Sequence, residues 1–355
     1  MKTLFRVLLS VGLLVLTGVM IAVANFFPDW FFSFYPEISR GIISVLGEIF
    51  SVIPVPMCEI FGALLILWFL VSLIRAICKL RFLRWCSGFL LSVCILVTAF
   101  VGIWGLNYYA PPMAQRLGLP EEQYTVSQLK EATVYFRDMA NAAAQKVERN
   151  EDGSFRSADF DELAVVANEG YLKLAEEYDC FKGSDAKVKR LIISPIMGKI
   201  GMTGGFICLT GESCVSDTTY PVSLPFTMCH EIGHRMAFAR EDEANFAGFL
   251  ACVSNERADF QYSAYYNAFL YCYNALYRAD QPAAKEVLSG ASELVRRDMG
   301  LASAHYQSIR SETASQITDQ VYDSYLKGFS VETGVQSYGE VADLLLIWYF
   351  ERVKG

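Results

Sequence analysis

The chain has 355 residues, 53% of them hydrophobic, and its mean hydropathy of +0.29 is too high for an ordinary soluble protein. The formal net charge is -8, and no run of Lys or Arg lies outside the apolar N-terminal region. The composition therefore argues against a nucleic-acid partner and for a membrane part followed by a globular part.

Three N-terminal segments are long and apolar enough to cross a bilayer. The first covers residues 7–27 and carries no charge. A cleaved signal peptide is the alternative here, because Ala22-Val23-Ala24 resembles a cleavage site, but the length of the segment favours an uncleaved anchor. The second and third spans are expected at residues 55–74 and 85–109.

The placement of basic residues predicts the orientation of these spans. Lys2 and Arg6 precede the first span, and the loop between the first two spans carries only Arg40. The short loop between the second and third spans is crowded with Arg75, Lys79, Arg81 and Arg84. Since positively charged loops stay cytoplasmic, we expect a multi-pass protein of the cell membrane with everything after the third span outside the cytoplasm.

Residues 37–52 are expected to form an amphipathic helix on the outer membrane surface. Packing beneath the globular domain is a further possibility for the same helix. Its apolar positions recur at helical spacing and are Ile38, Ile42, Val45, Leu46, Ile49 and Val52.

Pro111-Pro112 divides a membrane domain, residues 1–110, from a globular domain, residues 111–355. The globular domain is predicted to be α+β and mainly helical. The expected helices are 127–149, 158–178, 241–277, 302–327 and 338–352, and the expected strands are 189–194 and 204–210.

A His-Glu-x-x-His motif at His230, Glu231 and His234 is the strongest chemical signal in the chain. Residues four apart lie on one face of a helix, so both imidazoles can reach one metal ion, and imidazole nitrogen suits Zn²⁺. Ser223 is the expected N-cap of this helix, with Pro225 in its first turn. A solvated helix face is the plain alternative, but two of only three histidines in the chain lie here at ligand spacing.

The third ligand is predicted to be Glu241, with Asp242 and Glu243 as substitutes. Asn245, one turn further on, is expected to hydrogen-bond a ligand histidine. An unbroken helix would place Glu241 roughly 10 Å along the axis from His234. The helix must therefore end between residues 235 and 240, and a second helix must fold back, although no Gly or Pro marks the break.

This motif with its following Glu-x-x-x-Asn resembles the gluzincin class of zinc metallopeptidases. Residues 224–227 and 240–246 resemble more closely an uncharacterised bacterial membrane family, the domain-of-unknown-function family 3810. Further matching stretches are 201–204, 210–212, 262–265 and 322–327. The departures from gluzincins are Asn245, where that class often has Asp, and the short spacing from His234 to Glu241.

The resemblance implies a membrane-anchored protein with a zincin-like metallopeptidase domain, and it implies no substrate because the family is uncharacterised. From the motif itself we expect hydrolysis of peptide bonds in a peptide or protein substrate. Zinc would activate a water molecule and Glu231 would act as general base. The strand at 204–210 would then be an edge strand that a substrate peptide extends, and an ordinary internal strand is the alternative. An inactive zincin-like membrane scaffold or sensor, and a non-proteolytic zinc hydrolase, are the other functions that the motif allows.

Several residues are secondary candidates. Tyr262, Tyr265 and His305 are possible stabilisers of an oxyanion, although packing is the commoner role for each. Glu212 is a possible extra metal or substrate contact. The ten cysteines permit disulfides, but no spacing predicts a pairing.

Overall fold

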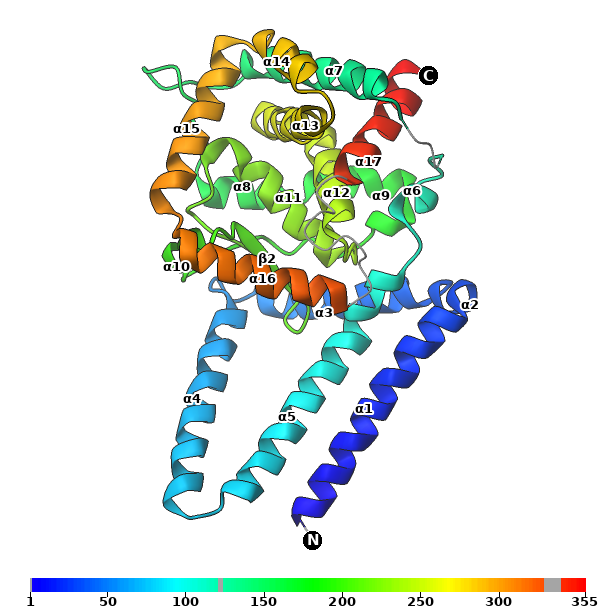
Figure 1. The fold of residues 1–355 in the computed structure, drawn as a ribbon, viewed down its shortest axis with the longest axis vertical. Coiled ribbons are helices and arrows are strands. Elements are labelled where there is room, and N and C mark those ends of the chain that lie inside the picture. The colour runs from blue at the N-terminus through cyan, green and yellow to red at the C-terminus, as the bar shows by residue number, and fades with distance from the viewer. Residues whose placement is uncertain (1, 121–123, 329–339) are drawn as a thin grey trace.

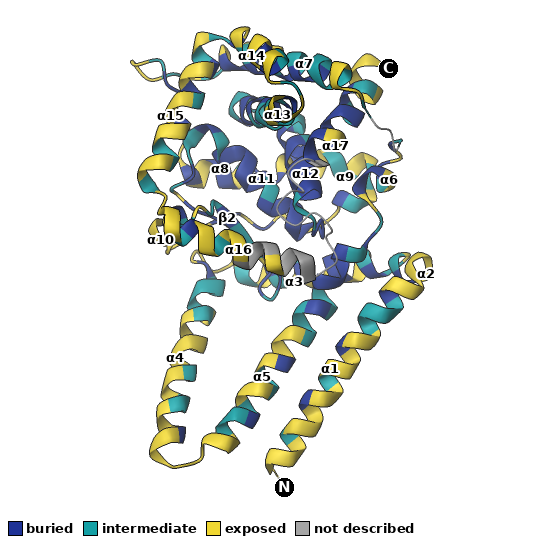
Figure 2. Ribbon diagram, viewed as in Figure 1, coloured by how far each residue is buried: buried dark blue, intermediate teal, exposed yellow. Residues whose placement is uncertain are grey.

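The computed structural model describes residues 2–120, 124–328 and 340–355. Three long helices extend from one side of a helical domain (Figure 1). Each is long and apolar enough to cross a membrane, and few of their residues are buried (Figure 2). They are α1 (Lys2–Phe26), α4 (Met57–Cys78) and α5 (Phe82–Ile103).

The three predicted spans are confirmed as helices, but the third ends earlier than expected. After α5 the chain turns into the short 3-10 helix η1 (Gly105–Tyr109) instead of continuing straight. The Asn107 amide stabilises this turn by donating to the Trp104 carbonyl at 2.9 Å and to Ser39 Oγ at 2.8 Å. The turn brings the chain from the membrane helix to the domain.

The short α2 (Pro28–Phe32) leads to α3 (Tyr35–Ser51), which lies across the domain-facing ends of α4 and α5 (Figure 1). One side of α3 packs beneath the domain, so closely that a Cβ on Gly211 would lie 2.4 Å from the Ile43 carbonyl oxygen. Gly211 also has a φ of +65°, which glycine adopts without strain. The predicted amphipathic helix therefore packs under the domain, and its outer side keeps an exposed apolar row of Ile38, Ile42, Val45 and Ile49.

The globular domain is mainly helical, with its core around α11, α12 and α13. Phe246 and Phe249 of α12 are buried in this core, as their helical spacing predicts. The helices are α6 (Met113–Arg116), α7 (Val126–Ala144), α8 (Phe160–Val166), α9 (Glu169–Glu177), α10 (Ser194–Ile200), α11 (Leu224–Arg235), α12 (Glu241–Ser254), α13 (Ala258–Ala279), α14 (Gln281–Ser289), α15 (Glu293–Ile309), α16 (Glu312–Gly328) and α17 (Glu340–Tyr349).

Several predicted helices were too long because side chains interrupt them. Residues 158–178 divide into α8 and α9 at Asn168, whose amide donates to the carbonyls of Asp185 and Ala186. Residues 241–277 divide into α12 and α13 where Asn255 accepts from the Arg257 N–H.

Helix α7 ends at Ala144, where the Arg149 side chain folds back and donates to the Ala144 carbonyl. Residues 302–327, predicted as one helix, are divided between α15 and α16. Helix α14 was not predicted. Residues 338–339 of the last predicted helix lie outside the described residues.

The sheet is small, with three strands in the order β1-β3-β2. β3 pairs in parallel with β1 and antiparallel with β2, so β2 is an edge strand within the described part of the chain. The predicted strands extended too far, since α10 already begins at Ser194 and a turn at Gly211 follows β2. The strands are β1 (Lys189–Arg190), β2 (Gly204–Ile207) and β3 (Glu212–Val215).

Glu212 joins this sheet to the membrane helix α4. Its carboxylate accepts the first-turn N–H groups of Met57 and Cys58 at 2.9 and 2.7 Å, where the helix dipole favours a negative charge. It also forms a buried ion pair with Lys189 at 2.6 Å. Glu212 thus caps α4, which corrects its prediction as an extra contact to metal or substrate.

Candidate metal centre

Helix α11 carries the His-Glu-x-x-His motif, and a neighbouring helix holds its first turn. Ser223 lies at the N-cap position, but its side chain accepts no hydrogen bond from the helix, contrary to the prediction. The Phe226 N–H instead donates to Ser263 Oγ of α13 at 3.1 Å. Pro225 does lie in the first turn, where a missing N–H costs little.

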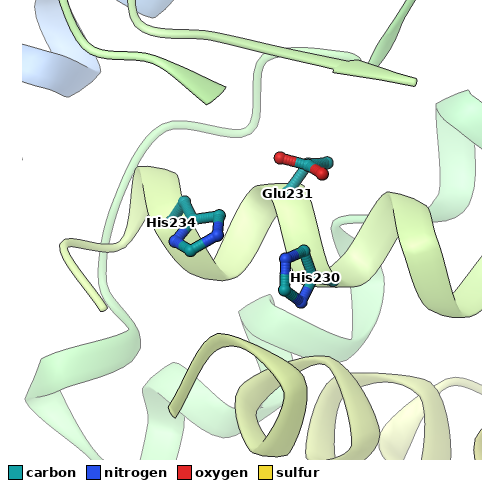
Figure 3. Close-up of side chains that lie close together, drawn as sticks. All are labelled: His230, Glu231 and His234. Atoms are coloured by element: carbon teal, nitrogen blue, oxygen red, sulfur yellow. The ribbon is translucent and has the colours of Figure 1, made fainter. Parts of the chain in front are cut away.

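The motif brings two imidazoles and a carboxylate together. One ligand atom from each of His230, Glu231 and His234 lies within 4.8 Å of the other two. Figure 3 shows the two imidazoles one turn apart, with the Glu231 carboxylate on the neighbouring side of the helix. The four-residue spacing predicts this arrangement.

Helix α11 ends abruptly after Arg235, as the prediction of a third ligand requires. Ala237 takes a left-handed conformation with a φ of 67°, and the Phe238 N–H donates back to the Gly233 carbonyl at 3.2 Å. A left-handed residue followed by such a backward bond is a common helix ending that usually contains glycine. Here alanine fills that position, which explains why no glycine marks the break.

The second helix of the pair, α12, starts at Glu241 and returns this side chain to the two imidazoles. Glu241 Oε2 lies 3.3 Å from His230 Nε2, and Oε1 lies 3.4 Å from His234 Nε2. A Cβ on Gly248 would lie only 3.0 Å from the main-chain nitrogen of His230, so a small residue there allows α12 to pack against α11. The fold therefore brings Glu241 to both histidines.

Two distances among these three side chains can be compared with those between zinc ligands. Tetrahedral ligands with zinc bonds of about 2.05 Å lie roughly 3.3 Å from one another. The separations of 3.3 Å from His230 Nε2 to Glu241 Oε2 and of 3.4 Å from His234 Nε2 to Glu241 Oε1 are close to this value. His230, His234 and Glu241 are therefore the candidate ligands of one ion.

Electrostatics favour a positive charge in this cluster. Burial alone would lower the pKa of His234, but the adjacent Glu241 carboxylate outweighs burial and raises the pKa to about 9. Burial would raise the pKa of Glu241, yet the two imidazoles hold it well below its ordinary value. A divalent cation can supply the positive charge in place of a proton.

Glu231 has the surroundings of a proton acceptor. Burial raises its pKa above the ordinary carboxylate value, against the opposing effect of the two histidines. Its Oε2 is buried and has no hydrogen-bond partner among the described residues. Strand β2 lies directly over it, since a Cβ on Gly204 would come within 2.4 Å of Glu231 Oε1.

The Phe238 carbonyl orients His234, where Asn245 was expected to orient a ligand histidine. His234 Nδ1 lies 2.8 Å from this carbonyl oxygen, so Nδ1–H donates and Nε2 faces Glu241. Asn245 Oδ1 accepts instead from the Tyr271 hydroxyl at 2.9 Å. The break after α11 thus both redirects the chain and positions a candidate ligand.

Glu243, a substitute for Glu241 in the sequence prediction, is engaged elsewhere. Its two oxygens accept from the Met113 N–H and from Arg116, each at 2.7 Å. Asp242 lies 3.6 Å from the Arg240 guanidinium. The structure brings only the first of the three consecutive acidic residues to the imidazoles.

The proposed oxyanion stabilisers have other partners. The Tyr262 hydroxyl donates to Asp298 at 2.6 Å, and Tyr265 packs edge-on against Phe249. His305 Nε2 lies 2.7 Å from the Thr218 carbonyl oxygen. Each of the three side chains thus has a partner outside the His–Glu cluster.

Sequence reasoning missed two residues that shape the site. Trp104, just after α5, donates its indole N–H to the His234 carbonyl at 3.2 Å. Gly204 gives Glu231 its space, and the Gly204-Gly205 pair inside a predicted strand was the available signal of a close approach.

The fold and the site together define a mainly helical protein with three potential membrane spans and a buried His–Glu cluster beside an edge strand. The chain belongs to the family described as protein of unknown function (DUF3810), whose model matches residues 34–346. The match includes α4, α5 and the whole cluster. No curated protein and no solved structure shows significant similarity to the chain.

Proposed function

We propose that the protein is a membrane-anchored zinc metallopeptidase whose zincin-like domain hydrolyses peptide bonds. The observation that carries this proposal is the position of Glu241, which lies 3.3 and 3.4 Å from the two motif imidazoles. A catalytic zinc site has three protein ligands and an open position, and Glu231 is the adjacent carboxylate that can act as a general base.

The roles of the side chains follow from their positions. His230, His234 and Glu241 would hold zinc. When bound, zinc would act as a Lewis acid and lower the pKa of a water molecule at its open position. Glu231 accepts a proton from the attacking water at its unpartnered Oε2 and returns that proton to the leaving amine. Its raised pKa eases the return step.

Strand β2 is the proposed binding edge for a peptide. It lies at the edge of the described sheet and touches Glu231 through Gly204. A peptide paired to this edge by backbone hydrogen bonds would be bound without a strict demand on its sequence.

The proposed orientation places the domain outside the cytoplasm. The N-terminus of α1 and the α4–α5 turn lie at the same end, opposite the domain (Figure 1). Arg6 of α1 donates to the Arg84 carbonyl there, so the two basic segments are neighbours. Positively charged segments stay cytoplasmic, and the exposed apolar row of α3 would rest on the opposite surface of the bilayer.

The test compares the purified full-length protein with Glu231→Gln for zinc content and for cleavage of casein and a membrane-protein mixture. We expect zinc in both proteins and cleavage only by the wild type. If neither protein binds zinc, the proposal is wrong and the histidines form an ordinary helix face.

Two other functions correspond to other outcomes of the same test. Zinc without any hydrolysis would favour an inactive zincin-like scaffold or sensor, although such a protein needs no general base at Glu231. Zinc with hydrolysis of non-peptide esters or amides alone would favour a non-proteolytic zinc hydrolase.

A further inference from the structure

Two cysteines from distant parts of the chain meet where the domain contacts α4. Cys58 is the second residue of α4 and Cys214 lies in β3, 156 positions further on. Their sulfur atoms are 3.7 Å apart. All ten cysteines of the chain are free thiols in the structure.

The backbone on both sides of this pair is held in place. Glu212 and Cys214 lie two residues apart on β3 and therefore on one face of the strand. The Glu212 carboxylate accepts the Cys58 N–H at 2.7 Å, and Lys189, the β1 partner of Cys214, forms an ion pair with Glu212. A disulfide bond of about 2.05 Å would require the two sulfur atoms to approach by about 1.7 Å within this held junction.

We propose that Cys58 and Cys214 form a reversible disulfide that links the membrane helix α4 to the sheet of the domain. The oxidant is a small-molecule or protein disulfide. The thiolate of the half-buried Cys58 attacks it, forms a mixed disulfide and releases one thiol. Cys214 then attacks the Cys58 sulfur and releases the second thiol, so two cysteine thiols lose two electrons and two protons to the external disulfide.

Exposure distinguishes this pair from the other buried cysteines. Cys58 is intermediate in exposure and Cys214 is buried, so Cys58 is the member of the pair that would react first with an external disulfide. Cys229 and Cys252 also interact with each other, but both are fully buried in the apolar core. An oxidant reaches Cys58 in the folded protein and does not reach the core pair.

The bridge would stiffen the support of the candidate metal centre. Ser213, next to Cys214 on β3, donates its hydroxyl to the Glu231 carbonyl at 2.8 Å. A covalent link at Cys214 would therefore fix α4, β3 and α11 relative to one another. This inference does not depend on the proposed peptidase activity.

The experiment treats the full-length protein in detergent micelles with oxidised glutathione, alkylates the free thiols and maps the peptides by mass spectrometry without reduction. We expect a linked peptide pair containing Cys58 and Cys214, reversed by dithiothreitol. The oxidised protein should also unfold at a higher temperature than the reduced one, because the link restricts the unfolded chain.

The variants separate this pairing from general thiol oxidation. Cys58→Ser should leave Cys214 as a free thiol, whereas Cys180→Ser, which removes another half-buried cysteine, should leave the link intact. The proposal is overturned if wild-type Cys58 and Cys214 both stay alkylatable while exposed Cys78 is glutathionylated. It is equally overturned if Cys58 keeps glutathione because Cys214 does not displace it.

Discussion

Trp104, the first residue after the membrane helix α5, donates its indole N–H to the main-chain carbonyl of His234 across 3.2 Å. The two rings lie 6.0 Å apart in an edge-on contact. The helix that carries the metal motif therefore ends against the end of a membrane helix, so the candidate metal centre lies at the junction of the two parts of the protein.

Replacing Trp104 by Phe should weaken both folding and metal binding. The new ring keeps an aromatic contact with Tyr108 and Phe206. The His234 carbonyl keeps the Ala237 N–H at 3.0 Å but loses its second donor, at a cost of about 0.5–1.5 kcal/mol. We expect a lower unfolding temperature and a weaker zinc affinity, measured by thermal unfolding and zinc titration in detergent.

Trp85→Phe is the control for this change. The Trp85 indole donates to Ser72 Oγ at 2.9 Å inside the α4–α5 hairpin. Its loss should lower the unfolding temperature without changing zinc affinity. Equal zinc affinities for Trp104→Phe and the wild type would contradict the role of the Trp104–His234 bond.

Glu241→Gln should lose zinc, whereas Glu243→Gln should lose stability. Outer partners of metal ligands typically change affinity by about 10–100-fold, so removal of a direct ligand at Glu241 should weaken zinc binding by more than about 100-fold. Glu243→Gln leaves Arg116 without its buried partner, which costs about 3–5 kcal/mol, and leaves the cluster intact.

Metal analysis and chemical unfolding of the two variants check this prediction. The unfolding temperature of the wild type should fall when a chelator removes zinc, because a ligand bound only to the folded state stabilises it. The temperature of Glu241→Gln should not respond to the chelator. If the two variants retain equal amounts of zinc, Glu241 is not a ligand.

Gly204→Ala should impair catalysis while zinc is retained. The added Cβ would lie 2.4 Å from Glu231 Oε1, so the carboxylate must move. General base catalysis contributes about 10²–10⁴-fold, and we expect peptide cleavage to fall by a factor in that range.

Gly205→Ala provides the matched control on the same strand. A Cβ at Gly205 meets no heavy atom within 4 Å, so this variant should keep zinc and lose much less activity than Gly204→Ala. Cleavage assays and zinc content on the same preparations distinguish the two variants. Normal activity in Gly204→Ala would show that Glu231 does not depend on the close approach of β2.

The stabilising effect of the Glu212 carboxylate at the N-terminus of α4 should be lost at low pH. Burial opposes ionisation of Glu212, but Lys189 and the Met57 and Cys58 N–H groups outweigh burial and hold its pKa below the ordinary value of 4.5. A carboxylate with a lowered pKa in the folded state stabilises the fold above its unfolded pKa, and this contribution disappears as the pH falls through the folded pKa.

Thermal unfolding between pH 7 and pH 3 tests the Glu212 cap. Near neutral pH, Glu212→Gln should be about 3–5 kcal/mol less stable than the wild type, because Lys189 loses its buried partner. The difference in the free energy of unfolding between this variant and the wild type should become smaller as the pH falls below 4.5. Glu256→Gln, which removes an exposed ion pair with Lys173, should show a much smaller difference. A constant gap for Glu212→Gln would refute this account.

Local periodicity was enough to predict the three apolar helices and the shared helix face of the two motif histidines. The spans follow from length and hydropathy, and the joint reach of His230 and His234 follows from the 3.6-residue helical turn. Both depend on residues close together in the chain. The predicted ends of helices were less accurate than the predicted spans. Single side chains such as Asn168 and Asn255 interrupt helices through hydrogen bonds to distant or flanking main-chain groups.

Only the tertiary structure distinguished Glu241 from Glu243 as the neighbour of the two imidazoles. That choice depends on a left-handed Ala237, which the identity of the residue does not reveal, and on close packing of α12 against α11 at Gly248. The Phe238 carbonyl at His234 and the approach of Cys58 to Cys214 likewise join backbone or side chains that the linear pattern does not relate. Such contacts arise from the packing of whole helices and strands, whereas the pattern of residues along one helix records only which of its faces is apolar.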